Sequence, residues 1–146
     1  MKMTKMLAAA AFAIMCASAC ASGPAFSTFQ STMPVLKPSD GRLWFYRTSS
    51  FGAAVQPDVK LNGETVGKSV AGGFFYVDRA PGSYKASAST EAERDLSLSL
   101  AAGEQKYIRM EPQMGLFVGT MKLVPVDVAV GQKEIAGTKY SGPIAK

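Results

Sequence analysis

Residues 73–88 are the segment that most limits the folds available to this chain, because two runs typical of β-strands lie on either side of a turn signal. Residues 74–77 are aromatic or β-branched, which are the types that favour a half-buried strand. Pro81 sets the φ of the second turn position, and Gly82 offers the positive φ of the third. After the turn, every second residue is apolar, as in a strand with one buried face and one solvent-exposed face. The pattern predicts a β-hairpin around which the other strands are arranged.

Similar alternation recurs along the chain and predicts an all-β protein. Asn62 and Gly63 lie between two β-type runs and predict a type I′ hairpin, which requires positive φ twice. Leu96, Leu98 and Leu100 alternate with serines, so one face of their strand is expected to be buried. Seven or eight short strands with regular turn signals predict an antiparallel β-sandwich. The remaining runs with strand character are residues 42–47, 55–61, 65–69, 105–111 and 120–126.

The N-terminal residues 1–19 have the organisation of an export signal. Lys2 and Lys5 precede an apolar run that is too short to span a bilayer and that ends in small residues. Two outcomes stay open: cleavage before Cys20 with acylation of that cysteine, or an ordinary A-x-A cleavage that leaves a soluble periplasmic or secreted product. Ala21, rather than an aspartate, follows Cys20, which is the pattern of bacterial lipoproteins sorted to the outer membrane. We expect an exported protein anchored to a membrane through acylated Cys20.

The remainder of the chain is expected to fall into three parts. Residues 20–40 are rich in Ser, Pro, Ala and Gly, which is typical of a tether. Residues 41–135 contain the predicted strands and form the β-sandwich domain, with one short helix expected near residues 128–135. Residues 136–146 are expected to form a tail that lies on the surface or frays.

The composition excludes several kinds of chemistry. The chain has no histidine, which removes the commonest general base, the usual zinc ligand and every Ser-His or Cys-His nucleophile. Its two cysteines, Cys16 and Cys20, lie near the N-terminus, so the predicted sandwich has neither a disulfide nor a thiolate nucleophile. The net charge of +5 comes from scattered lysines and arginines, which is not typical of a nucleic-acid-binding protein. We therefore expect no enzyme activity, no catalytic residue, no cofactor, no metal and no nucleic-acid partner.

Several short motifs occur in a characteristic order: GRLWFYR (41–47), PDVKLNGETVG (57–67), FFYV (74–77), PGSY (81–84), TE (90–91), and residues 103–109 and 114–119. Together they resemble a bacterial envelope lipoprotein family defined by a domain of unknown function, number 2846. The resemblance covers about residues 41–135 and implies secretion and membrane tethering, with no reaction, cofactor or catalytic residue to carry over. The alternation of an Asn-Gly hairpin with a Pro-Gly turn is also similar to prealbumin-like and immunoglobulin-like sandwiches, which implies architecture only.

Aromatic residues supply the candidate binding sites. Trp44 and Tyr46 share one face of a strand and could bind a glycan or an apolar ligand. The alternative is that this face is a second core layer, or is covered by the C-terminal tail. A candidate patch for an envelope protein partner or a membrane surface comprises the loop residues Phe51, Met114, Leu116 and Phe117, which could instead fold over the open ends of the sandwich.

Charged residues give a third candidate, an ion-pair cluster or an anion-binding site. The alternative is single surface charges worth less than about 1 kcal/mol each. The residues concerned are Arg47, Asp78, Arg79, Glu91 and Arg109. Because none of these patterns identifies a reaction, the sequence favours a non-catalytic protein of the cell envelope that acts through binding or structural contacts. The alternative function is a small-ligand or glycan-binding module that uses the Trp44 and Tyr46 face.

Overall fold

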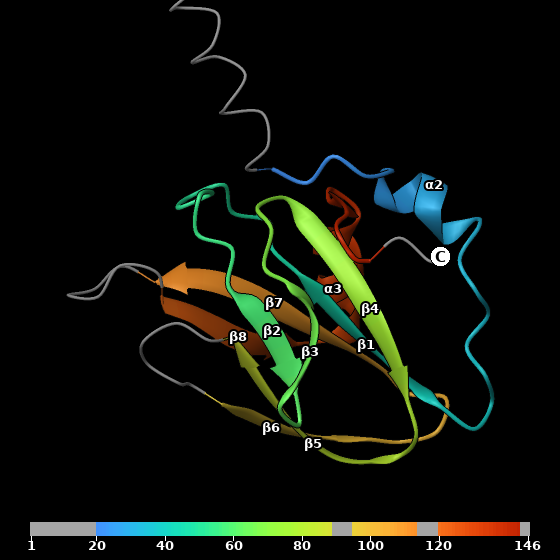
Figure 1. Cartoon of the computed structure of the whole chain (residues 1–146). Coiled ribbons are helices and arrows are strands. Elements are labelled where there is room, and N and C mark those ends of the chain that lie inside the picture. Colours follow the sequence, from blue (N-terminus) through green and yellow to red (C-terminus); the bar gives the residue numbers. More distant parts are fainter. Residues whose placement is uncertain (1–19, 89–94, 114–119, 144–146) are drawn as a thin grey trace, which may run out of the picture.

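The computed structural model describes residues 20–88, 95–113 and 120–143, and they form a β-sandwich with two short helices (Figure 1). The all-β sandwich predicted from the sequence is therefore confirmed. Neither of the described helices is long and apolar enough to cross a membrane. The elements are α2 (Phe26–Gln30), β1 (Gly41–Tyr46), β2 (Asp58–Leu61), β3 (Glu64–Lys68), β4 (Gly73–Arg79), β5 (Gly82–Ala88), β6 (Leu96–Leu100), β7 (Gln105–Gln113), β8 (Thr120–Val126), α3 (Val128–Ile135) and β9 (Lys139–Tyr140).

The strands form one sheet in the order β8-β7-β1-β4-β9 and a second in the order β3-β2-β5-β6. Most neighbouring strands are antiparallel, as predicted. Two pairs are parallel, β1 with β7 and β4 with β9, so the five-stranded sheet is mixed. Each parallel pair joins strands that are far apart in the sequence, and no turn signal could have indicated such a pairing. The short strand β9 lies in the segment that we expected to be a tail.

The two predicted hairpins have different outcomes. Asn62 and Gly63 have φ values of 49° and 83°, and they join the antiparallel strands β2 and β3, as predicted. By contrast, β4 and β5 do not pair with each other: β4 pairs with β1 and β9, and β5 pairs with β2 and β6. Gly82 does not adopt a positive φ. The chain therefore crosses from one sheet to the other at this point, and the predicted hairpin at residues 73–88 is wrong.

Burial explains why β4 and β5 separate. Successive aromatic residues of β4 point to opposite faces, and both Phe74 and Phe75 are completely buried, so β4 needs cover on both sides. Strand β5 buries Ala86 and Ala88, whereas Lys85 and Ser87 lie on its opposite, more exposed face. Because only one face of β5 is buried, β5 lies in the four-stranded sheet, whose outer side faces solvent.

The inner core fills the space between the two sheets. Phe45 and Phe75 lie at its centre with stacked rings whose centroids are 5.1 Å apart. Leu100 is almost fully buried, and Leu96 and Leu98 are partly buried and pack against the same cluster, so the predicted inward face of this strand is confirmed. The buried members of the inner core are Leu43, Phe45, Val59, Leu61, Phe75, Val77, Ala86, Ala88, Leu100, Ile108, Met110, Met121 and Leu123.

An outer aromatic layer covers the other face of the five-stranded sheet, where α2 and α3 lie (Figure 1). Phe26 of α2 makes edge-to-face contacts with Trp44 and Phe74. The segment 20–40, expected to be a tether, therefore contains a packed helix, because aromatic residues among its Ser and Pro residues bury themselves on the sheet. The helix predicted near residues 128–135 is confirmed. The buried members of the outer layer are Phe26, Trp44, Tyr46, Phe74, Tyr107 and Ile135.

Candidate functional site

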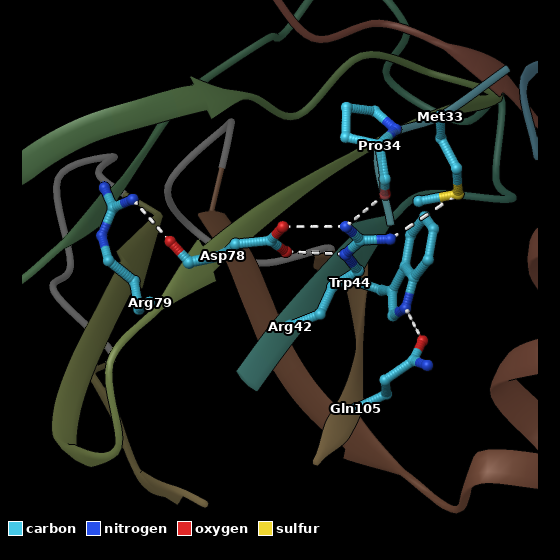
Figure 2. Close-up of polar contacts among 7 residues, drawn as sticks. All are labelled: Met33, Pro34, Arg42, Trp44, Asp78, Arg79 and Gln105. Atoms are coloured by element: carbon cyan, nitrogen blue, oxygen red, sulfur yellow. Dashed lines mark hydrogen bonds and ion pairs between the residues drawn. The ribbon is translucent and has the colours of Figure 1, made fainter. Parts of the chain in front are cut away.

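The aromatic face predicted from the sequence lies under the two helices. Trp44 is 3% exposed and Tyr46 is fully buried, so neither ring offers a free platform to a ligand. Trp44 and Tyr46 therefore belong to a second core layer, which was the alternative interpretation of this face. Only Trp44 reaches a cleft on the surface, where its indole Nε1–H donates to Gln105 Oε1 at 2.9 Å (Figure 2).

Arg42 lines this cleft, and Asp78 on β4 is its cross-strand partner. The guanidinium donates from Nε and Nη2 to the two carboxylate oxygens of Asp78 at 2.6 and 2.8 Å, and Nη2 also donates to the carbonyl of Pro34 at 3.0 Å (Figure 2). Its carbon Cζ lies 4.4 Å from the centroid of the Tyr76 ring. A bidentate partner and an aromatic face neutralise and immobilise the cation. Arg42 is therefore not free to bind an anion.

The cleft has a volume of about 450 Å³ and lies between α2, α3 and the outer face of the sheet. Trp44 and Tyr107 stack with their centroids 5.9 Å apart and form its floor. Burial raises the pKa of Tyr107, although its hydrogen bond with Gln132 acts in the opposite direction. The other polar side chains that line the cleft are uncharged: the amides of Gln30, Gln105 and Gln132 and the hydroxyl of Ser27.

A second polar cluster closes the outer layer at α3. The Tyr46 hydroxyl donates to Glu134 Oε2 at 2.6 Å, and Arg109 Nη1 donates to both carboxylate oxygens of Glu134 at 2.9 and 3.0 Å. Arg109 also contacts Glu111 at 2.7 Å. We could not predict this cluster, because Glu134 lies 25 residues from Arg109 and 88 from Tyr46 in the sequence.

The hydrogen bonds of this cluster determine which groups are charged. Burial and the hydrogen bond to Glu134 raise the pKa of Tyr46 well above its ordinary value. Partial burial alone would raise the pKa of Glu134, but the hydrogen bonds from Tyr46 and Arg109 outweigh it and lower the pKa below the ordinary 4.5. Glu134 is thus an anion and Tyr46 a neutral phenol near pH 7, so neither has the pKa of a general acid or base.

The predicted ion-pair cluster does not form as one unit. Arg109 and Asp78 belong to the two separate clusters above, and Arg79 lies 3.5 Å from Glu64. Arg47 is fully buried near Ser69, and its guanidinium donates to backbone carbonyls only. Glu91 lies outside the described residues.

Arg47 instead organises the loop between β1 and β2. Nη1 donates to the carbonyls of Val55 and Ser69 at 2.8 and 3.0 Å, and Nη2 donates to those of Phe51 and Gly52 at 2.6 and 3.0 Å. Burial lowers the pKa of Arg47, while the nearby Cys20 acts in the opposite direction. Its Nε has no hydrogen-bond partner among the described residues. The buried cation therefore stabilises the loop through its backbone.

Of the contact residues predicted in the loops and at the N-terminus, the structure describes only Phe51 and Cys20. Phe51 is 54% exposed. Cys20 is exposed and is not in a disulfide, at the first described position of the chain. Met114, Leu116 and Phe117 lie outside the described residues, as does the predicted signal segment 1–19. Within residues 20–88, 95–113 and 120–143, no group of three carboxylate or thiol side chains is arranged to hold a metal ion.

The matches to known proteins cover most of the β-sandwich. Residues 37–121 match the model of a family described as "Protein of unknown function (DUF2846)". An uncharacterized protein of Haemophilus influenzae is 32% identical to this chain over 124 residues, which are 82% of this chain and 74% of that protein. No solved structure is significantly similar to the chain. The matched range includes Arg42 and Asp78, whereas α2 and α3, which wall the cleft, lie outside it.

Proposed function

We propose that this chain, which belongs to the DUF2846 family of proteins of unknown function, is exported and anchored to an envelope membrane by acylation of Cys20. The observation that supports the proposal most strongly is the position of Cys20. It is exposed, it has no disulfide partner, and it lies where the predicted signal segment ends. A modifying enzyme can therefore reach the thiol, and the fold begins immediately after it. Several acyl chains at that site would make membrane binding effectively permanent.

We further propose that the anchored domain acts by binding or structural contact rather than by catalysis. The chain has no histidine, and the carboxylates of Asp78 and Glu134 each accept hydrogen bonds from an arginine. A general acid needs a raised pKa, whereas the hydrogen bonds from Tyr46 and Arg109 lower the pKa of Glu134. A screen of hydrolase substrates tests this point, and turnover that disappears on changing one acidic residue would overturn it.

The anchor is tested with the Cys20→Ser variant expressed from the full-length gene. Wild-type protein is expected to partition into the detergent phase and to have an intact mass raised by the acyl groups, whereas Cys20→Ser is expected to stay aqueous. Cys16→Ser is the matched control, because Cys16 lies in the segment expected to be removed. Wild-type protein with an unmodified Cys20 thiol, or cleaved after Cys20, refutes the proposal.

The proposed destination is the outer membrane, because Ala21 rather than an aspartate follows Cys20. The Ala21→Asp variant is expected to move the acylated protein from the outer-membrane to the inner-membrane fraction. Ser22→Asp is the control that places the same charge one residue later. Recovery of wild-type protein in the inner membrane would contradict the assignment without affecting the anchor.

The cleft supports a second candidate function, the binding of a small neutral polar ligand such as a glycan. Its aromatic floor and amide walls provide no uncompensated charge, because Arg42 is paired with Asp78. Trp44 is the only tryptophan of the chain, so its fluorescence reports binding directly. With N-acetylglucosamine oligomers as probes, Gln132→Ala is expected to weaken binding about tenfold through one lost hydrogen bond. Gln113→Ala, outside the cleft, is the control, and an unchanged fluorescence signal in all proteins excludes glycan binding.

A further inference from the structure

Three segments meet at the end of the sandwich where β1 ends and β4 begins, and we call this surface the Cys20 end. It comprises residues 20–25, 48–55 and 69–73. Cys20 forms a β-bridge with Ala71, and the amide of Ala21 donates to the carbonyl of Ala71 at 3.0 Å. The start of the described chain and the loop between β1 and β2 lie at this same end (Figure 1).

The chain after Cys20 is held against the sheet instead of hanging from it. The amide of Tyr140 donates to the carbonyl of Pro24 at 2.9 Å, and the amide of Phe26 donates to that of Thr138 at 3.0 Å. A flexible linker made of residues 21–40 would allow the domain to move about 25 Å from its anchor. Because the first hydrogen bond to the fold is made by Ala21, an acyl group on Cys20 would instead hold the Cys20 end at the membrane.

The composition of the Cys20 end suits contact with lipid. None of its three segments contains a charged residue, so a membrane surface would bury no ion there. The described strand ends beside it carry Lys139, the pair Lys68 and Asp58, with Nζ and Oδ1 3.6 Å apart, and Asp95, which pairs with Lys85. The opposite end differs in its connecting segments, which contain Lys37, Asp40 and Glu104, and its strand ends carry Glu64 and Arg79.

Phe51 is the apolar side chain that the Cys20 end presents to solvent, with 54% of its surface exposed. Arg47 fixes the backbone beneath it through the carbonyls of Phe51 and Gly52. We propose that the Cys20 end rests on the membrane, with Phe51 inserted into the lipid interface beside the acyl chains. This inference rests on the proposed anchoring at Cys20, and it adds a fixed orientation and a second lipid contact to that anchor.

Tryptophan fluorescence with brominated lipids tests this orientation. The Phe51→Trp and Trp44→Phe substitutions together place the only tryptophan of the chain in the loop. Val35→Trp with Trp44→Phe is the matched control, because Val35 is 91% exposed and precedes the opposite end of β1. Acylated full-length proteins are reconstituted in phosphatidylethanolamine and phosphatidylglycerol vesicles that contain lipids brominated near the head group. Phe51→Trp alone, with Trp44 retained, shows whether the Trp44→Phe change has disturbed the fold.

The proposal predicts loss of fluorescence and a blue-shifted emission for the Phe51→Trp protein and neither change for the Val35→Trp protein. Equal quenching at both positions, or none at either, overturns it, and the second result favours a protein as the occupant of the Cys20 end. Intact mass, measured before reconstitution, reports acylation separately. If cells do not acylate Cys20, coupling its thiol to a maleimide lipid still tests whether an anchor at this position orients the domain.

Discussion

The two faces of the five-stranded sheet are sealed in different ways. Strands of the second sheet cover the inner face, and the buried residues between them are mainly aliphatic, with the stacked rings of Phe45 and Phe75 at the centre. Two short helices cover the outer face, which is mainly aromatic and is bordered by the charged pairs of Arg42 and Glu134. The inner face is thus closed by the sheets themselves, whereas the outer face depends on segments near both ends of the chain.

This difference predicts that the outer layer opens before the inner core. Helix α2 has only five residues, and no side-chain hydrogen bond caps its N-terminus. An isolated helix of this length is unstable in water, so its stability comes from contacts with the sheet. Local opening of such segments costs less free energy than global unfolding. The four predictions below test this order, beginning with the largest expected effect.

Removal of the Phe75 ring should have the largest effect, because it leaves a cavity at the centre of the inner core. Phe75 is completely buried and stacks on Phe45. We expect Phe75→Ala to lower the free energy of unfolding by about 4 kcal/mol, measured by urea denaturation. Val128→Ala, at a position that is 50% exposed, should change it by less than about 0.5 kcal/mol. Similar values for the two variants would show that the inner core is not the main source of stability.

Removal of the Phe26 ring should have a smaller effect that remains local. Phe26 contacts Trp44 and Phe74, but the helix that carries it can detach while both sheets stay folded. We expect Phe26→Ala to cost about 2 kcal/mol, less than a fully enclosed phenylalanine, because detachment limits the loss. Hydrogen exchange should become faster in residues 20–33 and remain slow in β1. Acceleration throughout β1 would contradict a separately opening outer layer.

Gly131 tests how closely α3 approaches the sheet. A Cβ at this position would lie 2.3 Å from Cγ of Tyr107, so the helix must shift to accept alanine. Although alanine favours a helix by about 1 kcal/mol over glycine, we expect Gly131→Ala to destabilise the protein by about 1 kcal/mol overall. Gly137→Ala is the control, since a Cβ there would meet only Glu134 O at 3.8 Å. A stabilised Gly131→Ala variant would show that α3 is loosely attached.

The sequence predicted those parts of the fold whose signals are local. The alternating leucines of β6, the Asn62 and Gly63 turn and the helix at residues 128–135 each depend on neighbours in the chain, and each was predicted correctly. The partners of β4 and β5 were wrong because a turn signal does not specify which sheet receives the next strand. Helix α2 was missed because its Ser and Pro neighbours obscure one buried and one partly buried aromatic residue, Phe26 and Phe29.

The candidate sites show the same limit. The alternation of β1 places Trp44 and Tyr46 on one face, but the elements that cover this face come from distant segments, so their burial was only one of two open readings. Arg42 faces Asp78 only because β1 pairs with β4, and Glu134 reaches Arg109 only through α3. A single sequence contains no signal for such contacts. The export signal predicted before Cys20 has a pattern that is local in the sequence, and it stays a prediction.

The last prediction, with an effect no larger than that of Gly131→Ala, concerns the polar border of the outer layer. Glu134→Gln removes the charge that accepts hydrogen bonds from Tyr46 and Arg109, and we expect it to cost about 1 kcal/mol near pH 7. The pKa of Glu134 in the folded protein is below its ordinary value of 4.5, so the unfolded chain binds a proton more readily. The contribution of the carboxylate is therefore complete well above pH 4.5 and decreases as the pH falls through and below that value.

Urea denaturation of wild type and Glu134→Gln between about pH 7 and about pH 3 measures this contribution, and the two curves should converge as the medium becomes acidic. Glu64→Gln provides the control, because the Glu64 side chain is 72% exposed and its oxygen lies 3.5 Å from Arg79. An exposed pair of this kind contributes less than about 1 kcal/mol, so its removal should shift the curve little at any pH. A constant difference between wild type and Glu134→Gln across the whole range would mean that the shape of α3, rather than the charge on its glutamate, holds the outer layer closed.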